Sequence, residues 1–220
     1  MKHASTRAVF AYWNERRGNR PAPGRNEIDP SRIAPALGDT FMLSADFAEQ
    51  LRFRLAGTRV CALFCREIKG EALTELWHDD NRNSIDEVLS IITAETAGVV
   101  MGLTGHAEDG DTADLEMLLL PLARTAQSRT GLLGVLAPAT PIYWIGVKPV
   151  AAIEIKTVRH LGAEATNPSA RRFAALPNGT DVRHGFTVYT GGRADEPADK
   201  NSGLRTVQNF DANSTQNEPA

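Results

Sequence analysis

The stretch that decides the fold is NRNSIDEVLSIITAET, residues 81–96. Its large apolar side chains recur at positions i, i+3, i+4 and i+7, the period of an α-helix with one apolar face: Ile85, Val88, Leu89 and Ile92. Such a stripe stabilises a fold only when it leaves water, so it needs a partner surface. The sequence on both sides of this helix predicts that the partner is a β-sheet.

Alternation of apolar and polar side chains with a period of two predicts five strands around the helix. Two strands precede it, over residues 41–45 and 51–55, and the four or five residues between them are too few for a parallel crossover. The three following strands span residues 99–106, 114–121 and 132–137. Asp109-Gly110 predicts a hairpin turn between the first two of these. We therefore expect an α+β fold in which a five-stranded antiparallel sheet carries helices on one face.

The remaining sequence divides into an N-terminal helix, the sheet domain, an extension and a tail. Residues 1–20 predict a short amphipathic helix, and residues 21–150 hold the sheet domain. Residues 151–192 form an extension, in which residues 150–158 are compatible with one more strand. Residues 193–220 contain too few large apolar side chains to offset the conformational entropy lost on ordering, so we expect a disordered tail.

The charge balance argues against polyanionic partners. The chain has 220 residues and a formal net charge of −3, from 24 Lys and Arg against 27 Asp and Glu. Without a basic excess we expect no binding to nucleic acid and none to a membrane surface. The sequence shows no apolar run of the roughly 18 residues that a membrane span requires, and no secretory leader pattern. We therefore expect a cytoplasmic protein.

Several short motifs follow one another along the chain. They are Trp13 in the first helix, Ile28-Asp29-Pro30, residues 52–58 (RFRLAGT), residues 65–70 (CREIKG) before Leu76-Trp77, and residues 119–122 (LLPL). In the order and spacing of these motifs the sequence, over roughly residues 9 to 150, resembles the single-domain PAS protein family of alphaproteobacteria. Cys65 stands where that family has glycine. The resemblance implies the PAS fold and a sensory or regulatory role through ligand or partner binding, without an established chemistry or a particular ligand.

The residue patterns of three common cofactors are missing. Cys65-Arg66 is similar to the flavin-adduct cysteine of photoreceptor PAS domains, but the Asn-Cys-Arg-Phe-Leu-Gln run that surrounds that cysteine is absent. Residues 81–96 contain no His, whereas haem-binding PAS domains generally take an axial His from the long helix. Cys61 and Cys65 have no second pair of Cys or His at zinc-finger spacing. We expect no cofactor and no metal.

Sequence motifs of catalysis are missing as well. The chain has no Gly-x-Ser-x-Gly, no Gly-x-x-x-x-Gly-Lys and no Gly-x-Gly-x-x-Gly. The acidic residues near the predicted hairpin are of the kind that solvated turns usually carry: Glu108, Asp109, Asp111 and Asp114. We therefore expect that the protein is not an enzyme and has no catalytic residue. A small-molecule enzyme with unrecognised acid and base groups is a third alternative.

A ligand site is expected between the long helix and the concave face of the sheet. The side chains expected to line it come from the strands and from the start of the helix: Phe53, Leu55, Met117, Leu119, Leu133, Trp77 and Arg82. The alternative is that the same side chains fill a core without a cavity.

The sequence thus predicts a non-enzymatic sensory or regulatory module that binds a small ligand, a protein partner or both, and relays a signal in trans. Val9, Phe10 and Trp13 form an apolar stripe that either docks on the chain's own sheet or pairs with a second copy as a homodimer. A signalling protein is the other expected partner. The alternative from another class is a ligand-free protein-interaction adaptor with a fully packed core.

Overall fold

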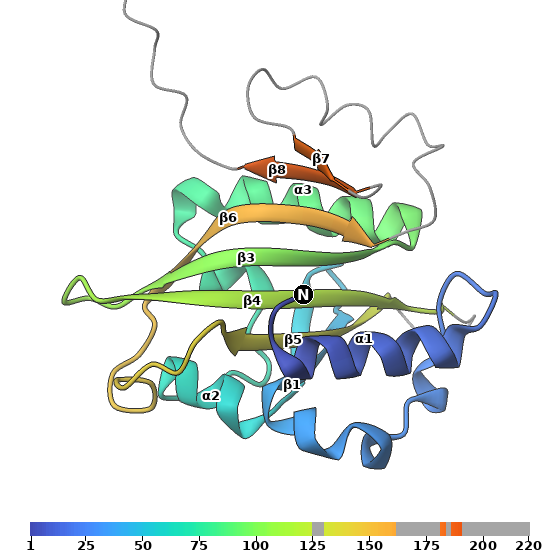
Figure 1. Ribbon diagram of the computed structural model, residues 1–220, viewed down its shortest axis with the longest axis horizontal. Coiled ribbons are helices and arrows are strands. Elements are labelled where there is room, and N and C mark those ends of the chain that lie inside the picture. Colours follow the sequence, from blue (N-terminus) through green and yellow to red (C-terminus); the bar gives the residue numbers. More distant parts are fainter. Residues whose placement is uncertain (125–129, 162–180, 184–185, 191–220) are drawn as a thin grey trace, which may run out of the picture.

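The computed structural model describes residues 1–124, 130–161, 181–183 and 186–190, and its strands form one antiparallel sheet (Figure 1). The strands in chain order are β1 (Thr40–Ala45), β2 (Leu51–Ala56), β3 (Gly98–His106), β4 (Thr112–Leu122), β5 (Gly131–Pro138), β6 (Ala152–Leu161), β7 (Asp181–Arg183) and β8 (Phe186–Thr190). Their order across the sheet is β2-β1-β5-β4-β3-β6-β8-β7. The five expected strands are confirmed as β1 to β5, and β6 adds a sixth long strand.

Strand β6 lies in the segment expected to be an extension. It pairs with β3 along its whole length, from Gly98 opposite Leu161 to His106 opposite Ala152. Residues 152–161 are therefore part of the sheet. The segment 193–220, expected as a disordered tail, lies outside the described residues, so that expectation stays a prediction.

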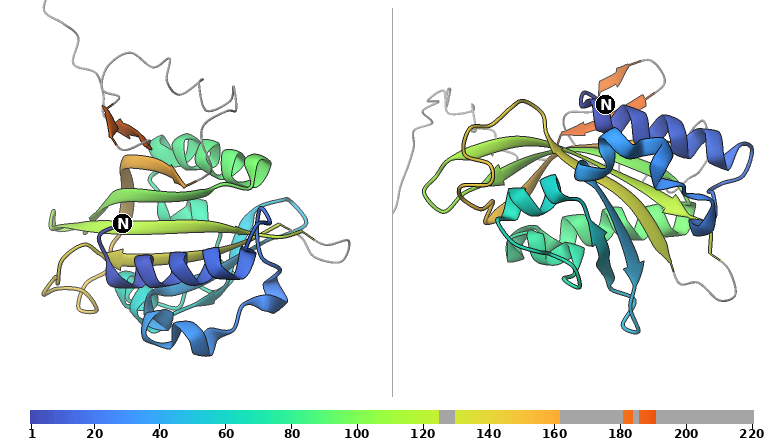
Figure 2. Two further views of the ribbon diagram at one scale, coloured as in Figure 1. Left: turned by 45° about the vertical axis from the view of Figure 1, so that its right-hand side comes forward. Right: turned by 90° about the horizontal axis from the view of Figure 1, so that it is seen from below.

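Helices cover both faces of the sheet (Figure 2). The helical elements are α1 (Ala4–Arg17), η1 (Arg25–Glu27), η2 (Pro30–Asp39), α2 (Thr58–Phe64), η3 (Leu73–Leu76) and α3 (Asp79–Glu95), where η denotes a 3-10 helix. α2, η3 and α3 pack on the face that we call inner, and α1 and η2 pack on the opposite, outer face. The expectation of helices on one face therefore holds for the inner layer, and the outer layer is an addition to it.

The stripe of α3 packs against the sheet as its periodicity predicts. Ile85, Val88, Leu89 and Ile92 are all buried in one cluster with the inward side chains of the strands. Burial of one such side chain contributes roughly 1.5–3 kcal/mol, so these four together offset part of the conformational entropy that α3 loses on ordering. The antiparallel layer under the long helix is thus confirmed.

A β-bulge interrupts the pairing of β2 with β1. Leu43 pairs with Phe53, but the preceding residue, Met42, pairs with Leu55, so that Arg54 is an additional residue in β2. Because paired residues of an antiparallel ladder share a face, the extra residue moves Leu55 to the outer face beside Met42, while Phe53 stays on the inner face. The bulge decides which of the predicted site residues meet.

No helix within the described residues is long and apolar enough to cross a membrane.

Candidate functional site

Four of the seven predicted site residues meet on the inner face. Phe53 comes from β2, Met117 and Leu119 from β4, and Trp77 from the segment between η3 and α3, and all four are buried in the same cluster. Phe53 packs on Phe41 of β1 with ring centroids 5.3 Å apart. The candidate site therefore lies at the middle of the core, between α3 and the concave face of the sheet.

The other three predicted residues lie elsewhere. Leu133, on β5, is buried in the outer cluster, and Leu55 is 56% exposed beside the same face because of the bulge at Arg54. Arg82, on α3, is exposed to solvent. The expectation that all seven line one pocket is therefore wrong for these three side chains, although their strands and helix are where the sequence placed them.

Trp77 is held at the junction between η3 and α3. Its backbone N–H donates to the carbonyl of Thr74 at 3.2 Å, and its backbone bridges to Ile153 of β6. The side chain is 2% exposed, and the indole Nε1–H has no hydrogen-bond partner among the described residues. A buried donor without an acceptor costs about 1–3 kcal/mol, so a ligand that supplied an acceptor at this point of the core would gain a hydrogen bond. The sequence predicted Trp77 as a residue that lines the ligand site, but no sequence pattern indicated that its N–H would be unpaired.

His160 of β6 is a titratable group near the candidate site that sequence reasoning missed. It pairs with Val99 of β3, whose side chain faces the inner cluster. Burial lowers the pKa of His160, while the carboxylate of Glu95 at the end of α3 acts in the opposite direction. The imidazole is thus held toward its neutral form. Simple alternation along β6, counted from the buried Ile153, would place His160 on the outer face. The register shift opposite Gly102 and Leu103 places it on the inner face instead, so the sequence alone could not have indicated its position.

The apolar stripe of α1 docks on the chain's own sheet. Val9 and Trp13 are buried, and the Trp13 Nε1–H donates to the carbonyl of Pro121 on β4 at 2.9 Å. Phe10 is half-buried and stacks on Trp13 with centroids 6.4 Å apart. Docking was one of the two expected arrangements. The homodimer through these residues stays a prediction.

The two cysteines lie on or just after α2. Cys61 is half-buried, and Cys65 is exposed with a left-handed backbone, at φ 51°. Burial raises the pKa of the Cys61 thiol, and the nearby Glu67 carboxylate acts in the same direction. Among the described residues no group of three or more His, Cys, Asp and Glu side chains is arranged to hold a metal ion. The positive φ at Cys65 is the geometry for which glycine is favoured.

Comparisons with known proteins place the sequence in one family. The family model described as PAS domain matches residues 1–137. No curated protein matches the sequence.

Several solved structures are similar to part of this chain. One is the dark structure of the blue-light photoreceptor Aureochrome1 LOV, which is 14% identical with a TM-score of 0.40, over 49% of this chain and 80% of that one. Another is an RNA-binding Light-Oxygen-Voltage receptor, 17% identical with a TM-score of 0.39, over 50% of this chain and 33% of that one. A PAS domain of a protein from Colwellia psychrerythraea is 16% identical with a TM-score of 0.36, over 49% of this chain and 94% of that one. At these identities and TM-scores the likeness carries no fold, ligand or activity over to this chain.

Proposed function

This chain belongs to the PAS domain family, and from that membership we propose that it is a non-enzymatic sensory or regulatory module that signals in trans from the cytoplasm. PAS domains are generally sensory modules without catalysis of their own. We place the sensing site on the inner face, around Trp77, Phe53, Met117 and Leu119. A small ligand bound there would act on α3, and a protein partner would respond to the change.

The single observation that supports this site is the unpaired indole N–H of Trp77. The surrounding side chains of the inner cluster are apolar, so the donor faces a medium in which it strengthens any hydrogen bond that it makes. A compact apolar molecule with one acceptor oxygen or nitrogen fits that chemistry. Its acceptor would satisfy Nε1, and its body would replace side-chain contacts beneath α3.

A second candidate function is the ligand-free adaptor, which is favoured by the packing of the same cluster. Phe53, Met117 and Leu119 are each at most 1% exposed, as expected when side chains and not a ligand fill the space. In an adaptor, the core supports the fold, and outer surfaces bind the partner.

Native mass spectrometry of the purified chain separates the two functions. Trp77→Phe removes the unpaired N–H, and Trp13→Phe is the matched control because its N–H is bonded to Pro121 on the outer face. A sensor shows an additional mass that is retained by Trp13→Phe and lost from Trp77→Phe. A bare wild-type mass, together with no change in thermal unfolding across a small-molecule library, would refute the sensing site and leave the adaptor.

A further inference from the structure

Four of the exposed large apolar side chains lie in two pairs on either side of α2. Leu37 and Leu55 are 38% and 56% exposed, and Tyr143 and Val147 are 88% and 82% exposed. Contiguous exposed apolar patches mark interaction surfaces, whereas single exposed side chains need no explanation.

The first pair belongs to a groove on the outer face. It is an apolar hollow of about 160 Å³, which we call the η2 groove. Eleven of the described residues line it, among them Leu37, Phe41, Leu55 and Gly57. None of these side chains carries a charge. The bulge at Arg54 is what places Leu55 in this wall.

The second pair lies on the segment between β5 and β6, residues 139–151, which we call the Tyr143 loop. The loop is firmly held: Trp144 is buried, and its carbonyl accepts from the backbone N–H of Val147 at 3.0 Å across Gly146, at φ 81°. Lys148 bonds to Asp109 and Asp111 of the β3–β4 hairpin, and its Nζ lies 5.4 Å from the Trp144 ring centroid. Tyr143 and Val147 are therefore presented to solvent by a fixed backbone, which lowers the entropy cost of binding.

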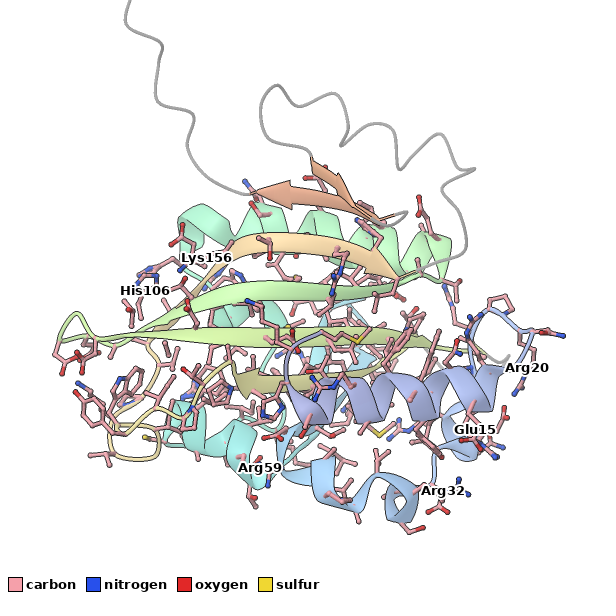
Figure 3. All side chains as sticks on the ribbon, in the orientation of Figure 1. Glu15, Arg20, Arg32, Arg59, His106 and Lys156 are labelled. Carbon is pink, nitrogen blue, oxygen red and sulfur yellow. The ribbon has the colours of Figure 1, made fainter. Side chains whose placement is uncertain are left out.

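The charges beside the two surfaces are complementary. Arg54, next to Leu55, is exposed and supplies the positive charge beside the groove, because the guanidinium of Arg59, which lies over Gly38 (Figure 3), is paired with the carboxylate of Asp39. Next to the Tyr143 loop, Asp109 and Asp111 share the single ammonium of Lys148, which leaves a net negative charge. Glu108 is also exposed on the same hairpin.

Helix α2 joins the two surfaces within one molecule (Figure 1). Gly57, immediately before α2, lines the η2 groove. At the other end, Gly146 lies against Ala62, and the backbone N–H of Val150 donates to the carbonyl of Leu63 at 2.8 Å. α2 has seven residues and spans about 10 Å, at 1.5 Å per residue. A loop and a groove this close together on each copy suit a two-fold pair, in which both contacts form at once.

We propose that the η2 groove binds the Tyr143 loop of a second copy of this chain, in a reciprocal two-fold dimer across α2. Tyr143 and Val147 enter the groove against Leu37 and Leu55, and the acidic hairpin approaches Arg54 of the other copy. The half-buried Cys61 and Ala62 are small side chains on α2, so the two helices can approach closely. The dimer needs no ligand beneath α3, and therefore stands or falls separately from the sensing site.

Complementation between two variants tests this dimer. Leu55→Glu alters the groove, Val147→Asp alters the loop, and Phe47→Ser is the control on the exposed tip of the β1–β2 hairpin, away from both surfaces. Analytical ultracentrifugation over a concentration series gives the dissociation constant of each protein and of an equimolar mixture of the first two variants. Far-ultraviolet circular dichroism verifies the fold, which these exposed positions leave unchanged.

The wild type and Phe47→Ser are expected to dimerise alike, and each of the other variants alone is expected to weaken the dimer at least about tenfold. Their mixture recovers part of the association, because the mixed dimer keeps one intact contact of groove and loop, whereas each variant alone keeps none. Three results overturn the proposal: a monomeric wild type at about 100 μM, well above a typical micromolar dissociation constant, variants that dimerise like the wild type, or a mixture that associates no better than its components.

Discussion

Asp39 at the end of η2 bonds to Arg59 of α2 and to Ser5 of α1, and removing the positive charge of Arg59 should lower the free energy of unfolding. Asp39, at the end of η2, has a side chain that is only 3% exposed. Arg59 of α2 donates to both of its oxygens, at 2.6 and 2.8 Å, and Ser5 of α1 donates at 2.5 Å. The carboxylate therefore ties the outer helices to α2.

Arg59→Met keeps most of the apolar stem and removes the charge. The variant loses two of three bonds to a buried carboxylate, and bonds of that kind contribute about 1.5–3 kcal/mol each. Because the Arg59 side chain is 55% exposed, water replaces part of this interaction. We expect a loss of about 3 kcal/mol, toward the lower limit for breaking a buried ion pair. Urea unfolding followed by tryptophan fluorescence should show a midpoint lower by about 1 M.

The pH dependence of the free energy of unfolding tests the same role of Asp39 independently. Burial alone would raise the pKa of Asp39, but the bonds from Arg59 and Ser5 hold it below its usual value of 3.8. A carboxyl group with a depressed pKa stabilises the fold above its unfolded pKa, and that stabilisation is lost as the pH falls through the folded pKa. The gap between wild type and Arg59→Met should therefore be full at pH 7 and should narrow below pH 3.8.

Arg66→Met is the matched control, since Arg66 pairs with Glu71 at 2.9 Å and the two side chains are 49% and 28% exposed, so that neither partner is buried as Asp39 is. Such a pair contributes about 0–1 kcal/mol. An Arg59→Met cost no greater than that of Arg66→Met, or a cost that stays constant down to pH 3, would refute the assigned role of Asp39.

Three further substitutions test local features, each by the free energy of unfolding from urea titration. Cys65→Gly should stabilise the fold by about 1 kcal/mol, because φ is 51° there and glycine adopts that conformation without strain; a loss would contradict the backbone assignment. Gly134→Ala should cost about 3 kcal/mol or more, since the added Cβ would lie 2.2 Å from the buried Phe41 ring, and a neutral result would show that the ring moves freely. Trp13→Phe should cost about 1–2 kcal/mol through its lost bond to the Pro121 carbonyl, and intact stability would mean that α1 is held by packing alone.

Features with a simple period were predictable from the sequence. The i, i+3, i+4, i+7 stripe of α3 and the alternation of β1 to β5 depend on local residue patterns, and both appear as expected. The hairpin at Asp109-Gly110 also appears, with Gly110 at φ 93°. In these elements, the local preference and the tertiary packing agree, so the pattern is sufficient.

Features decided by contacts between distant segments were not predictable in the same way. Residues 51–55 alternate perfectly, yet pairing with β1 introduces the bulge at Arg54 and reverses the face of Leu55. In η2, Ile33 and Leu37 have the four-residue spacing of one α-helical face, but η2 is a 3-10 helix with Pro35 inside it and a kink at Ile33, and Leu37 is 38% exposed. The unpaired N–H of Trp77 depends on which acceptors the other described segments bring near it in three dimensions, and no local sequence pattern encodes that.

The two proposed surfaces are close enough for one to influence the other. Phe53 packs on Phe41 in the inner cluster, with ring centroids 5.3 Å apart, and residue 41 of β1 also contributes to the wall of the η2 groove. Gly134 leaves no room for the Phe41 ring to withdraw past β5 without a shift of that strand. A ligand that displaced Phe53 would therefore act on the η2 groove through one intervening residue of β1, Phe41. It would change dimerisation only by the difference in its affinity for the two packings of Phe41, so an equal dissociation constant with and without a bound ligand would mean that this contact transmits nothing.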